Sequence, residues 1–192
     1  MRRNTPITIE DFGADYGYSV GLINFDHLFA LEKISRKNFR EYGGTLGFTF
    51  FDMLKALQIR NIDPSDIHIY VIGKFFTRDL WEGVEEDEKE YEGQECIVFE
   101  VEEIYGYCLS YYYDDDKVQI AHLCIDPRFQ RKGFGKMLLE KASCNWRKTV
   151  TADVYYDNEQ SANFFKKNGF SFIKNEEKKR WRVIRKIVTK KI

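Results

Sequence analysis

The chain has 192 residues and a formal net charge of −1, and 43% of its residues are hydrophobic and 16% aromatic. This apolar content excludes a disordered chain, and the length allows one core of ordinary size. No apolar run approaches the roughly 20 residues that span a bilayer, and residues 1–10 lack the apolar stretch of a secretory signal. We therefore expect one cytoplasmic domain over residues 1–192, with no membrane segment.

The cysteines exclude two further classes of protein. Cys96, Cys108, Cys124 and Cys144 stand far apart in the sequence. They have neither the close pairs of a zinc site nor the density of a disulfide scaffold. Three of the four fall in apolar surroundings, where we expect packed, reduced thiols, and we expect no metal site.

Three elements are predicted in the N-terminal part, residues 1–95. Asp26 precedes His27–Phe39 and would accept the first free amides of a helix there. A second helix is expected over Phe50–Arg60 and a strand over Ile67–Ile72.

Charge is unevenly distributed along the chain. Residues 82–103 contain eleven carboxylates against one lysine, and residues 166–192 contain eleven Lys or Arg against two Glu. The acidic segment would attract a polycation and the basic one nucleic acid, unless both are simply solvated surfaces. Since the two signals point in opposite directions, they do not decide the partner.

A hairpin and a third strand are predicted next. Cys96–Glu102 and Tyr107–Tyr113 are rich in β-branched and aromatic residues, which favours two strands separated by a break. Val118–Ile125 suits a strand covered on both faces, and Asp126-Pro127 would end it because proline cannot donate to a ladder.

The rest of the chain predicts two helices alternating with strands. A helix is expected where apolar residues recur at helical spacing, namely at Leu138, Leu139, Ala142 and Trp146. Further along, Asn158 would start a helix of residues 159–168 and Gly169 would end it in a left-handed conformation. The expected strands are Val150–Tyr156, Phe170–Ile173 and Arg180–Val188. The predicted order is three strands, helix, strand, helix and two strands.

The segment most informative about chemistry lies between the third strand and the first of these helices. It reads Gln130-Arg131-Lys132-Gly133-Phe134-Gly135-Lys136. A P-loop would need glycine at position 130 and Ser or Thr at 137, and a Rossmann fingerprint would need glycine at 138; none of these is present. The amides of residues 131–136 would instead converge at a helix N-terminus and, with three basic side chains, suit a pyrophosphate. A plain glycine-rich turn is the alternative.

Two ordered motifs in this region resemble a known family. Ile125–Gly135 resembles motif A of the GNAT superfamily of N-acetyltransferases, with the pattern Q/R-x-x-G-x-G/A, and Asn158–Phe170 resembles its motif B. The resemblance covers about residues 96–188 and leaves residues 1–95 as the acceptor side. It implies an α/β (α+β) fold with a mixed, mostly antiparallel sheet, a splayed central strand pair and flanking helices.

The resemblance also implies acetyl-CoA as acyl donor, no metal, and direct attack by an amine. Main-chain groups of Leu123, Cys124 and Ile125 would bind pantetheine. The remaining expected cofactor-binding residues are Gln130, Arg131, Lys132, Gly133, Phe134, Gly135, Lys136, Asn158 and Ser161. Asn158 can equally be a helix cap, and Ser161 can equally be a small residue at a packing contact.

The proton-transfer groups are less determined than the cofactor loop. The family's usual acid is a tyrosine of motif B, but this position is Phe165, so Tyr155, Tyr156 or water would have to replace it. His122 is a candidate base because its ordinary pKa of about 6.5 suits the task. Glu102 and Glu103 are rival bases, and His122 can instead be a packed residue on the wrong face of its strand.

Three functions remain open from the sequence. The first is acetylation of an amine of a small molecule or protein, by a monomer or homodimer. The second is a toxin-like acetylation of aminoacyl-tRNA, and the third is acyl-CoA binding without turnover.

Overall fold

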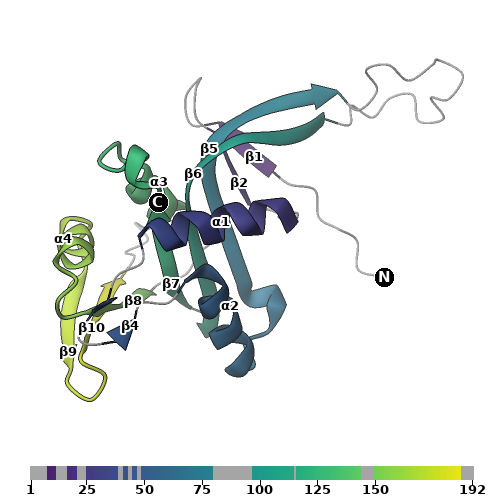
Figure 1. Ribbon diagram of the computed structural model, residues 1–192. Helices are drawn as coiled ribbons and strands as arrows, with labels where there is room; N and C mark the ends of the chain where they lie inside the picture. Colours follow the sequence, from purple (N-terminus) through teal and green to yellow (C-terminus); the bar gives the residue numbers. More distant parts are fainter. Residues whose placement is uncertain are drawn as a thin grey trace, which may run out of the picture.

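A computed structural model of the protein describes residues 8–11, 17–20, 25–38, 41–42, 45–46, 49–79, 97–114, 116–143 and 149–186. These residues form a mixed eight-stranded sheet and a separate two-stranded hairpin, with helices on both faces of the large sheet (Figure 1). The strand order is β1-β2-β5-β6-β7-β8-β10-β9. Neighbours are antiparallel except β7 and β8, which are parallel. The predicted fold class is confirmed.

The elements have the following bounds. The strands of the large sheet are β1 (Thr8–Asp11), β2 (Gly17–Val20), β5 (Ile67–Asp79), β6 (Ile97–Asp114), β7 (Lys117–Ile125), β8 (Thr149–Tyr155), β9 (Ser171–Asn175) and β10 (Arg180–Lys186). The hairpin consists of β3 (Glu41–Tyr42) and β4 (Thr45–Leu46). The helices are α1 (Phe25–Lys37), α2 (Phe50–Ile59), α3 (Phe134–Ser143) and α4 (Glu159–Lys167), with short 3-10 turns η1 (Pro64–Asp66) and η3 (Pro127–Phe129).

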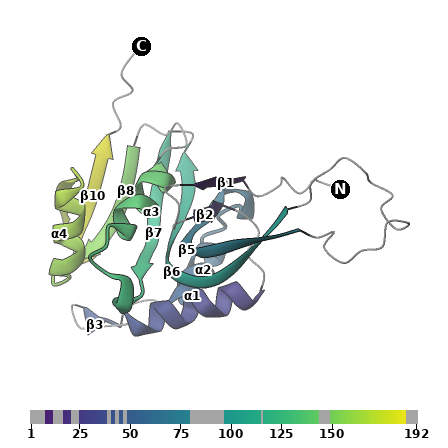
Figure 2. The ribbon, with the colours of Figure 1, turned by 90° about the horizontal axis from the view of Figure 1, so that it is seen from above.

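Two hydrophobic cores lie on opposite faces of the sheet, because successive strand residues point to opposite faces. On one face, α3 and α4 pack over β7, β8 and β10 through residues such as Leu138, Phe165 and Val183. On the other, α1 and α2 pack over β6 and β7 through residues such as Leu31 and Tyr107. Figure 2 shows α1 and α3 on opposite sides of the sheet. In the described residues, α1 and α2 pack mainly over β6 and β7 and do not cover β8, β10 or β9.

Strand β6 differs from the predicted hairpin. Residues 97–114 form one continuous strand rather than two, and the break expected at 103–106 is a pair of register irregularities against β5. A Cβ atom on Gly106 would lie 2.4 Å from Ile125 Cδ1, and one on Gly73 would lie 2.2 Å from the Glu103 carbonyl oxygen. The glycine that suggested a turn thus permits close approach of neighbouring strands.

The helix predictions are mostly confirmed, with one correction. Helix α1 begins at Phe25, so Asp26 lies inside it and is not its N-cap. Helix α2 has a cap that was not predicted: the Thr49 side chain accepts from the Asp52 amide, and the Asp52 carboxylate accepts from the Thr49 amide. Helix α4 ends before Gly169, whose φ of +79° confirms the left-handed conformation.

Some predicted features lie outside the described residues. These are Trp146, Cys96, Cys144, residues 187–188 and most of the acidic segment. Cys108 and Cys124 are buried free thiols, as predicted for them. Among the described helices, none combines the length and apolar character needed to cross a membrane.

Candidate functional site

The parallel strands β7 and β8 pair at one end only. Their ladder runs from Lys117 opposite Thr149 to Ile120 opposite Ala152. Beyond it, residues 122–125 of β7 pair with β6 alone, and residues 153–155 of β8 pair with β10 alone. We call the unpaired part the open end of the strand pair and the hydrogen-bonded part its closed end. The predicted splay is therefore present, and among the described strands none pairs with this edge of β7 at the open end.

The glycine-containing loop, residues 130–136, follows β7 at this open end and leads into α3. Lys136 and Met137 donate their amides to the Gly133 carbonyl, which closes the first turn. Within the described residues, the amides of Lys132, Gly133 and Gly135 donate no main-chain hydrogen bond. Unused amides at a helix N-terminus favour an anion. The loop thus has the donors that the sequence predicted for a pyrophosphate.

The backbone of this loop is tightly bent. Gly133 has φ of +91° and Arg131, which carries a side chain, has φ of +65°. A non-glycine residue in this region is uncommon and costs about 1 kcal/mol or more. A Cβ atom on Gly135 would lie 3.3 Å from the Phe164 ring and 3.7 Å from Leu123 Cδ2. Gly135, at the start of α3, therefore lies next to both α4 and β7.

The three basic side chains of the loop are exposed. Lys132 Nζ lies 5.2 Å from the Phe129 ring centroid, and Lys136 Nζ lies 3.6 Å from the Glu140 carboxylate. Arg131 is exposed as well. Phe134 differs from its neighbours because its side chain is buried in the core under α3, beside Tyr105. Only its main chain is available to a ligand.

Gln130 has a second role that the sequence did not indicate. Its amide nitrogen donates to the Asn38 side-chain oxygen at 3.0 Å and to the Ile125 carbonyl at 3.2 Å. Asn38, just after α1, donates to the same carbonyl at 3.1 Å. On α4, Gln160 donates to Gln130 at 3.4 Å. The Ile125 carbonyl, expected to bind pantetheine, is therefore already accepting from two side chains, whereas Leu123 and Cys124 remain candidates.

Asp126 reinforces this connection between α1 and the end of β7. Its carboxylate accepts from Lys37 at 2.5 Å and from Arg128 at 3.1–3.2 Å, and it is almost fully buried. Burial alone would raise the pKa of Asp126, but these hydrogen bonds outweigh burial and lower it to about 2. The charged carboxylate thus holds α1 against the strand that precedes the loop. Lys37 and Asn38 could not be found from sequence, since 89 residues separate Lys37 from Asp126 and 92 separate Asn38 from Gln130.

His122 lies in the open-end part of β7, on the face toward α1. Its Nδ1 is 2.8 Å from the Tyr107 hydroxyl, and its Nε2 is 3.7 Å from the Cys124 sulfur. The side chain is partly exposed. Burial lowers the pKa of His122 to about 4, against a smaller opposing effect of Glu32. The imidazole is therefore neutral at pH 7. The sequence did not determine which face of the sheet His122 lies on; a bulge at Ala121 shifts the alternation of side chains along β7 and places His122 on the face toward α1.

The neighbours of His122 are protonated at neutral pH. Burial raises the pKa of Cys124 to about 12 and raises the pKa of Tyr107 as well. Both groups can therefore act as hydrogen-bond donors to the ring, but neither is an anion beside it. Tyr107, which lies one strand away on β6, was not singled out by its sequence context.

Glu103, the rival base, has a different environment. It forms an ion pair with Arg128 at 3.1 Å and belongs to the part of β6 beyond the Gly106–Ile125 pair. The side chain of Glu102 lies outside the described residues. The structure thus brings His122 to the open end, and it leaves Glu103 in an ion pair with Arg128 beyond the end of β7.

Helix α4 lies beside the loop. The Asn158 side chain accepts from the Ser161 amide at 3.0 Å. Asn158 therefore caps the helix, which is one of the two roles predicted for it. Phe164 faces Gly135, whereas Phe165 is buried against Phe170. Phe165, at the usual position of the acid, is a core residue.

The hydroxyl groups of the two alternative tyrosines, at the end of β8, have different surroundings. The Tyr155 hydroxyl accepts from Arg180 at 2.6 Å. The Tyr156 hydroxyl is buried without a hydrogen-bond partner in the described structure, and its ring lies 5.0 Å from that of Trp181. Tyr155, unlike Tyr156, is thus joined to a polar group at the open end.

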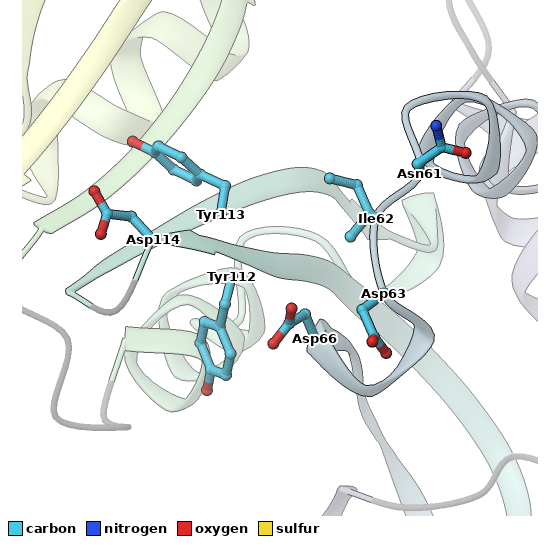
Figure 3. Close-up of a pocket in the computed structure, with 7 residues that line it drawn as sticks. All are labelled: Asn61, Ile62, Asp63, Asp66, Tyr112, Tyr113 and Asp114. Carbon is cyan, nitrogen blue, oxygen red and sulfur yellow. The ribbon is translucent and has the colours of Figure 1, made fainter.

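A separate pocket of about 430 Å³ lies at the closed end, between the turn after α2 and the end of β6. Figure 3 shows Tyr112 and Asp66 close together within it, with Tyr113 and Asp114 next to Tyr112 at the end of β6. Because it lies at the other end of β7 from the loop, it is not part of the candidate site.

Comparisons with known proteins agree with this geometry. Residues 92–172 match the family described as the acetyltransferase (GNAT) domain. No curated protein sequence matches the chain. In two of the solved structures with this fold, an acetyltransferase from Streptococcus agalactiae has a TM-score of 0.61 at 13% identity, and one from Thermus thermophilus has 0.59 at 19%. The first comparison covers 91% of this chain and 100% of the other, and the second covers 88% and 97%.

A third structure with the same fold is the ribosomal-protein-S18-alanine N-acetyltransferase from Escherichia coli. Its TM-score is 0.52 at 12% identity, over 87% of this chain and 90% of that one. At such identities the structures establish the fold, whereas the domain match concerns the sequence itself. Residues 92–172 thus match the acetyltransferase (GNAT) domain in sequence, and the described part of the chain, with its splayed strands and amide-bearing loop, has the fold of the acetyltransferases compared.

Proposed function

We propose that this protein transfers an acetyl group from acetyl-CoA to the amine of a small molecule or protein by direct attack. The observation that carries the proposal is the juxtaposition of the open end of β7 and β8 with the unpaired amides of Lys132, Gly133 and Gly135. The amides suit the pyrophosphate, and the unpartnered edge of β7 suits the amide groups of pantetheine. When bound, acetyl-CoA supplies an acyl group already activated as a thioester.

Holding the amine against this acyl group would supply much of the rate, because a positioned reaction avoids the entropy cost of an encounter. Side chains of Leu123 and Phe164 border the space next to Gly135 and would exclude water from it. The face toward α1 and α2 is left for the acceptor.

We favour His122 over Glu103 as the group that accepts the proton lost by the attacking nitrogen. His122 is neutral at pH 7 and lies in the unpaired part of β7, whereas Glu103 is engaged by Arg128. With its pKa at about 4, His122 is a weak base, so it would act on the nitrogen as the new bond forms and the nitrogen becomes acidic.

Tyr155 is the better of the two tyrosines for protonating the leaving thiolate. Its hydroxyl is at the end of β8 and contacts the Arg180 guanidinium, whereas the Tyr156 hydroxyl is enclosed beside Trp181. A Tyr155→Phe variant should lower kcat with little change in the KM for acetyl-CoA. An unchanged kcat would leave water as the proton source.

The function is tested by measuring CoA release from acetyl-CoA with a panel of amines. The panel includes amino acids, polyamines, aminoglycosides, lysine peptides, aminoacyl-tRNA and peptides with free N-termini, since one protein of this fold is named as acting on an alanine of a ribosomal protein. We expect amine-dependent release above the hydrolysis seen without amine, with mass spectrometry showing the acetylated product. Absence of acetyl-CoA binding in calorimetry would refute the proposal.

Acyl-CoA binding without turnover is a second candidate, favoured by two observations. The usual acid position is the buried Phe165, and the pKa of His122 is far below that of an efficient base at pH 7. Tight acetyl-CoA binding with no amine-dependent release from the whole panel would establish this alternative.

A further inference from the structure

Two arginines, Arg180 and Arg182, lie on the same face of β10. In the register of the sheet they stand opposite Tyr155 and Asp153 of β8. Val154 and Val183, which are adjacent to these positions in their strands, pack into the core under α3. Because successive strand residues point to opposite faces, the two arginines lie on the face opposite α3. Positions 153–155 are the part of β8 that extends past its pairing with β7. Both arginines therefore flank the open end on the acceptor face.

The guanidinium of Arg182 is paired with groups of the protein itself. Its Nε lies 2.6 Å from Asp153 Oδ1 and its Nη2 donates to Asp153 Oδ2 at 3.2 Å. Its Nη1 donates to Gln119 at 3.4 Å. This two-point contact with a carboxylate is the geometry for which a guanidinium is best suited. The charge of Arg182 is thus compensated by its neighbour.

Arg180 has no such compensation. It donates from Nη2 to the Tyr155 hydroxyl at 2.6 Å, and its guanidinium carbon lies 4.3 Å from the Tyr155 ring centroid. No ion pair of Arg180 with a carboxylate occurs in the described part of the chain, and its Nε is buried without a hydrogen-bond partner. The side chain is half-buried. A buried donor without a partner costs free energy, so such a group calls for an explanation.

The position of Arg180 supplies this explanation. Contact with Tyr155 shows that the side chain leans over β8, toward the open end, and not over β9 on the other side of β10. The aromatic ring would hold the guanidinium in place by a cation–π interaction. A planar fork held in this way presents its remaining N–H groups as a preformed site for anionic oxygens.

We propose that Arg180 binds an anionic group, a carboxylate or a phosphate, carried by the amine acceptor. The proposal rests on the proposed function, and it narrows the acceptor to amines that also bear negative charge. A polyamine would bring like charge to Arg180 and would be a poor acceptor. Arg182 provides the matched comparison, because it has the same side chain on the same face but is already paired.

Binding is tested by calorimetry on the full chain saturated with CoA. The ligands are two pairs of amines that differ in the anion: O-phosphoethanolamine with ethanolamine, and glycine with glycinamide. We expect the anionic member of at least one pair to bind about tenfold tighter or more, because hydrogen bonds between charged groups are stronger than those between neutral ones. The phosphate and carboxylate pairs distinguish the two sources of the anion.

Two variants assign the preference to its residue. Arg180→Gln should remove the difference within each pair, and Arg182→Gln should retain it. Thermal melts confirm that both variants are folded. The proposal is overturned if the wild-type protein binds both members of each pair equally, if Arg180→Gln keeps the preference, or if Arg182→Gln loses it equally.

Turnover separates this proposal from the proposed function. If the anionic amines bind through Arg180 but no amine releases CoA from acetyl-CoA, the anion site stands and the proposed acetyl transfer fails. If uncharged amines are acetylated with kcat/KM values equal to those of their anionic partners, acetyl transfer stands and the anion site fails.

Discussion

The two ends of the β7–β8 pair differ in how far their polar groups are satisfied within the protein. At the closed end, main-chain ladder bonds join the strands, and the Thr151 hydroxyl bonds the Gln119 side chain at 2.6 Å. At the open end, the same strands present an unpaired edge of β7, a loop with unused amides and the unpaired charge of Arg180. An unpaired strand edge, unused amides and a guanidinium without a carboxylate partner are all able to take a ligand, so together they favour the open end over the closed end as the place where one would bind.

The largest effect is expected from Gly135→Glu at the open end. The new side chain would start 3.3 Å from Phe164 and place a carboxylate beside the loop amides, where the pyrophosphate is expected. Like charges placed together cost several kcal/mol, so affinity for acetyl-CoA should fall by about 100-fold or more in calorimetry.

Gly135→Ala is the graded control for this variant. It adds only the methyl group that contacts Phe164, so it should lose only a few-fold in affinity if the ring can shift slightly. Urea denaturation verifies that both proteins are folded. Undiminished affinity in folded Gly135→Glu would remove the loop from the site.

The second prediction concerns the pH dependence of stability at His122. The folded-state pKa of about 4 lies below the ordinary 6.5, so the unfolded chain binds the proton more readily. The stability that depends on neutral His122 is therefore complete above pH 6.5 and is lost progressively toward pH 4. The loss amounts to about 3 kcal/mol. The difference between the wild-type protein and His122→Gln, measured by urea denaturation across this range, should show it.

Asp126 also contributes to the pH dependence of stability, but it titrates below the pH range of this measurement. Its pKa is lowered from 3.8 to about 2, so its contribution is lost only as the pH falls below 3.8. A wild-type-minus-variant difference that is constant between pH 6.5 and pH 4 would show that His122 is better solvated than its contacts with Tyr107 and Cys124 indicate.

A third prediction tests the closed end. Thr151→Val removes a buried hydroxyl while preserving shape, and it leaves the Gln119 oxygen with only its long contact to Arg182. The free energy of unfolding should fall by about 1–2 kcal/mol, with affinity for acetyl-CoA unchanged. A loss of affinity comparable to the loss of stability would show that the two ends are not separable.

The smallest effect is expected at Asn158, where a cap and a cofactor contact are both possible roles. Asn158→Ala should lower the free energy of unfolding by about 1 kcal/mol, because the Ser161 amide loses its acceptor. Asn158→Asp should restore it, since aspartate caps equally well. If Asn158→Asp is fully stable but binds acetyl-CoA more weakly, the side-chain amide also contacts the cofactor.

The sequence allowed much of the open end to be predicted, because its determinants are local. The glycines, the basic residues and the helix start of the loop all lie within residues 130–136, and strand β7 and helix α4 were predicted nearly to their observed bounds. The break in β6 was predicted wrongly, because Gly106 permits close strand approach and does not form a turn.

What could not be predicted depends on contacts between distant parts of the chain. Asn38 and Lys37 reach the end of β7 from α1, and Tyr107 reaches His122 across a strand pair. The short strands β1 to β4 carried no pattern long enough to be recognised. The contrast between Arg180 and Arg182 likewise depends on which residue stands opposite each in β8, and this register is not encoded in either strand alone.

The order of the last three strands has a practical consequence for expressing shorter pieces of this protein. Strand β10 lies between β8 and β9, yet it follows both in the chain and falls outside residues 92–172. A polypeptide cut to those residues would also lose residues 173–175 of β9, and it would leave β8 with an exposed edge on its β10 side. Unpaired edges promote association between chains, so such a fragment should be recovered as aggregate.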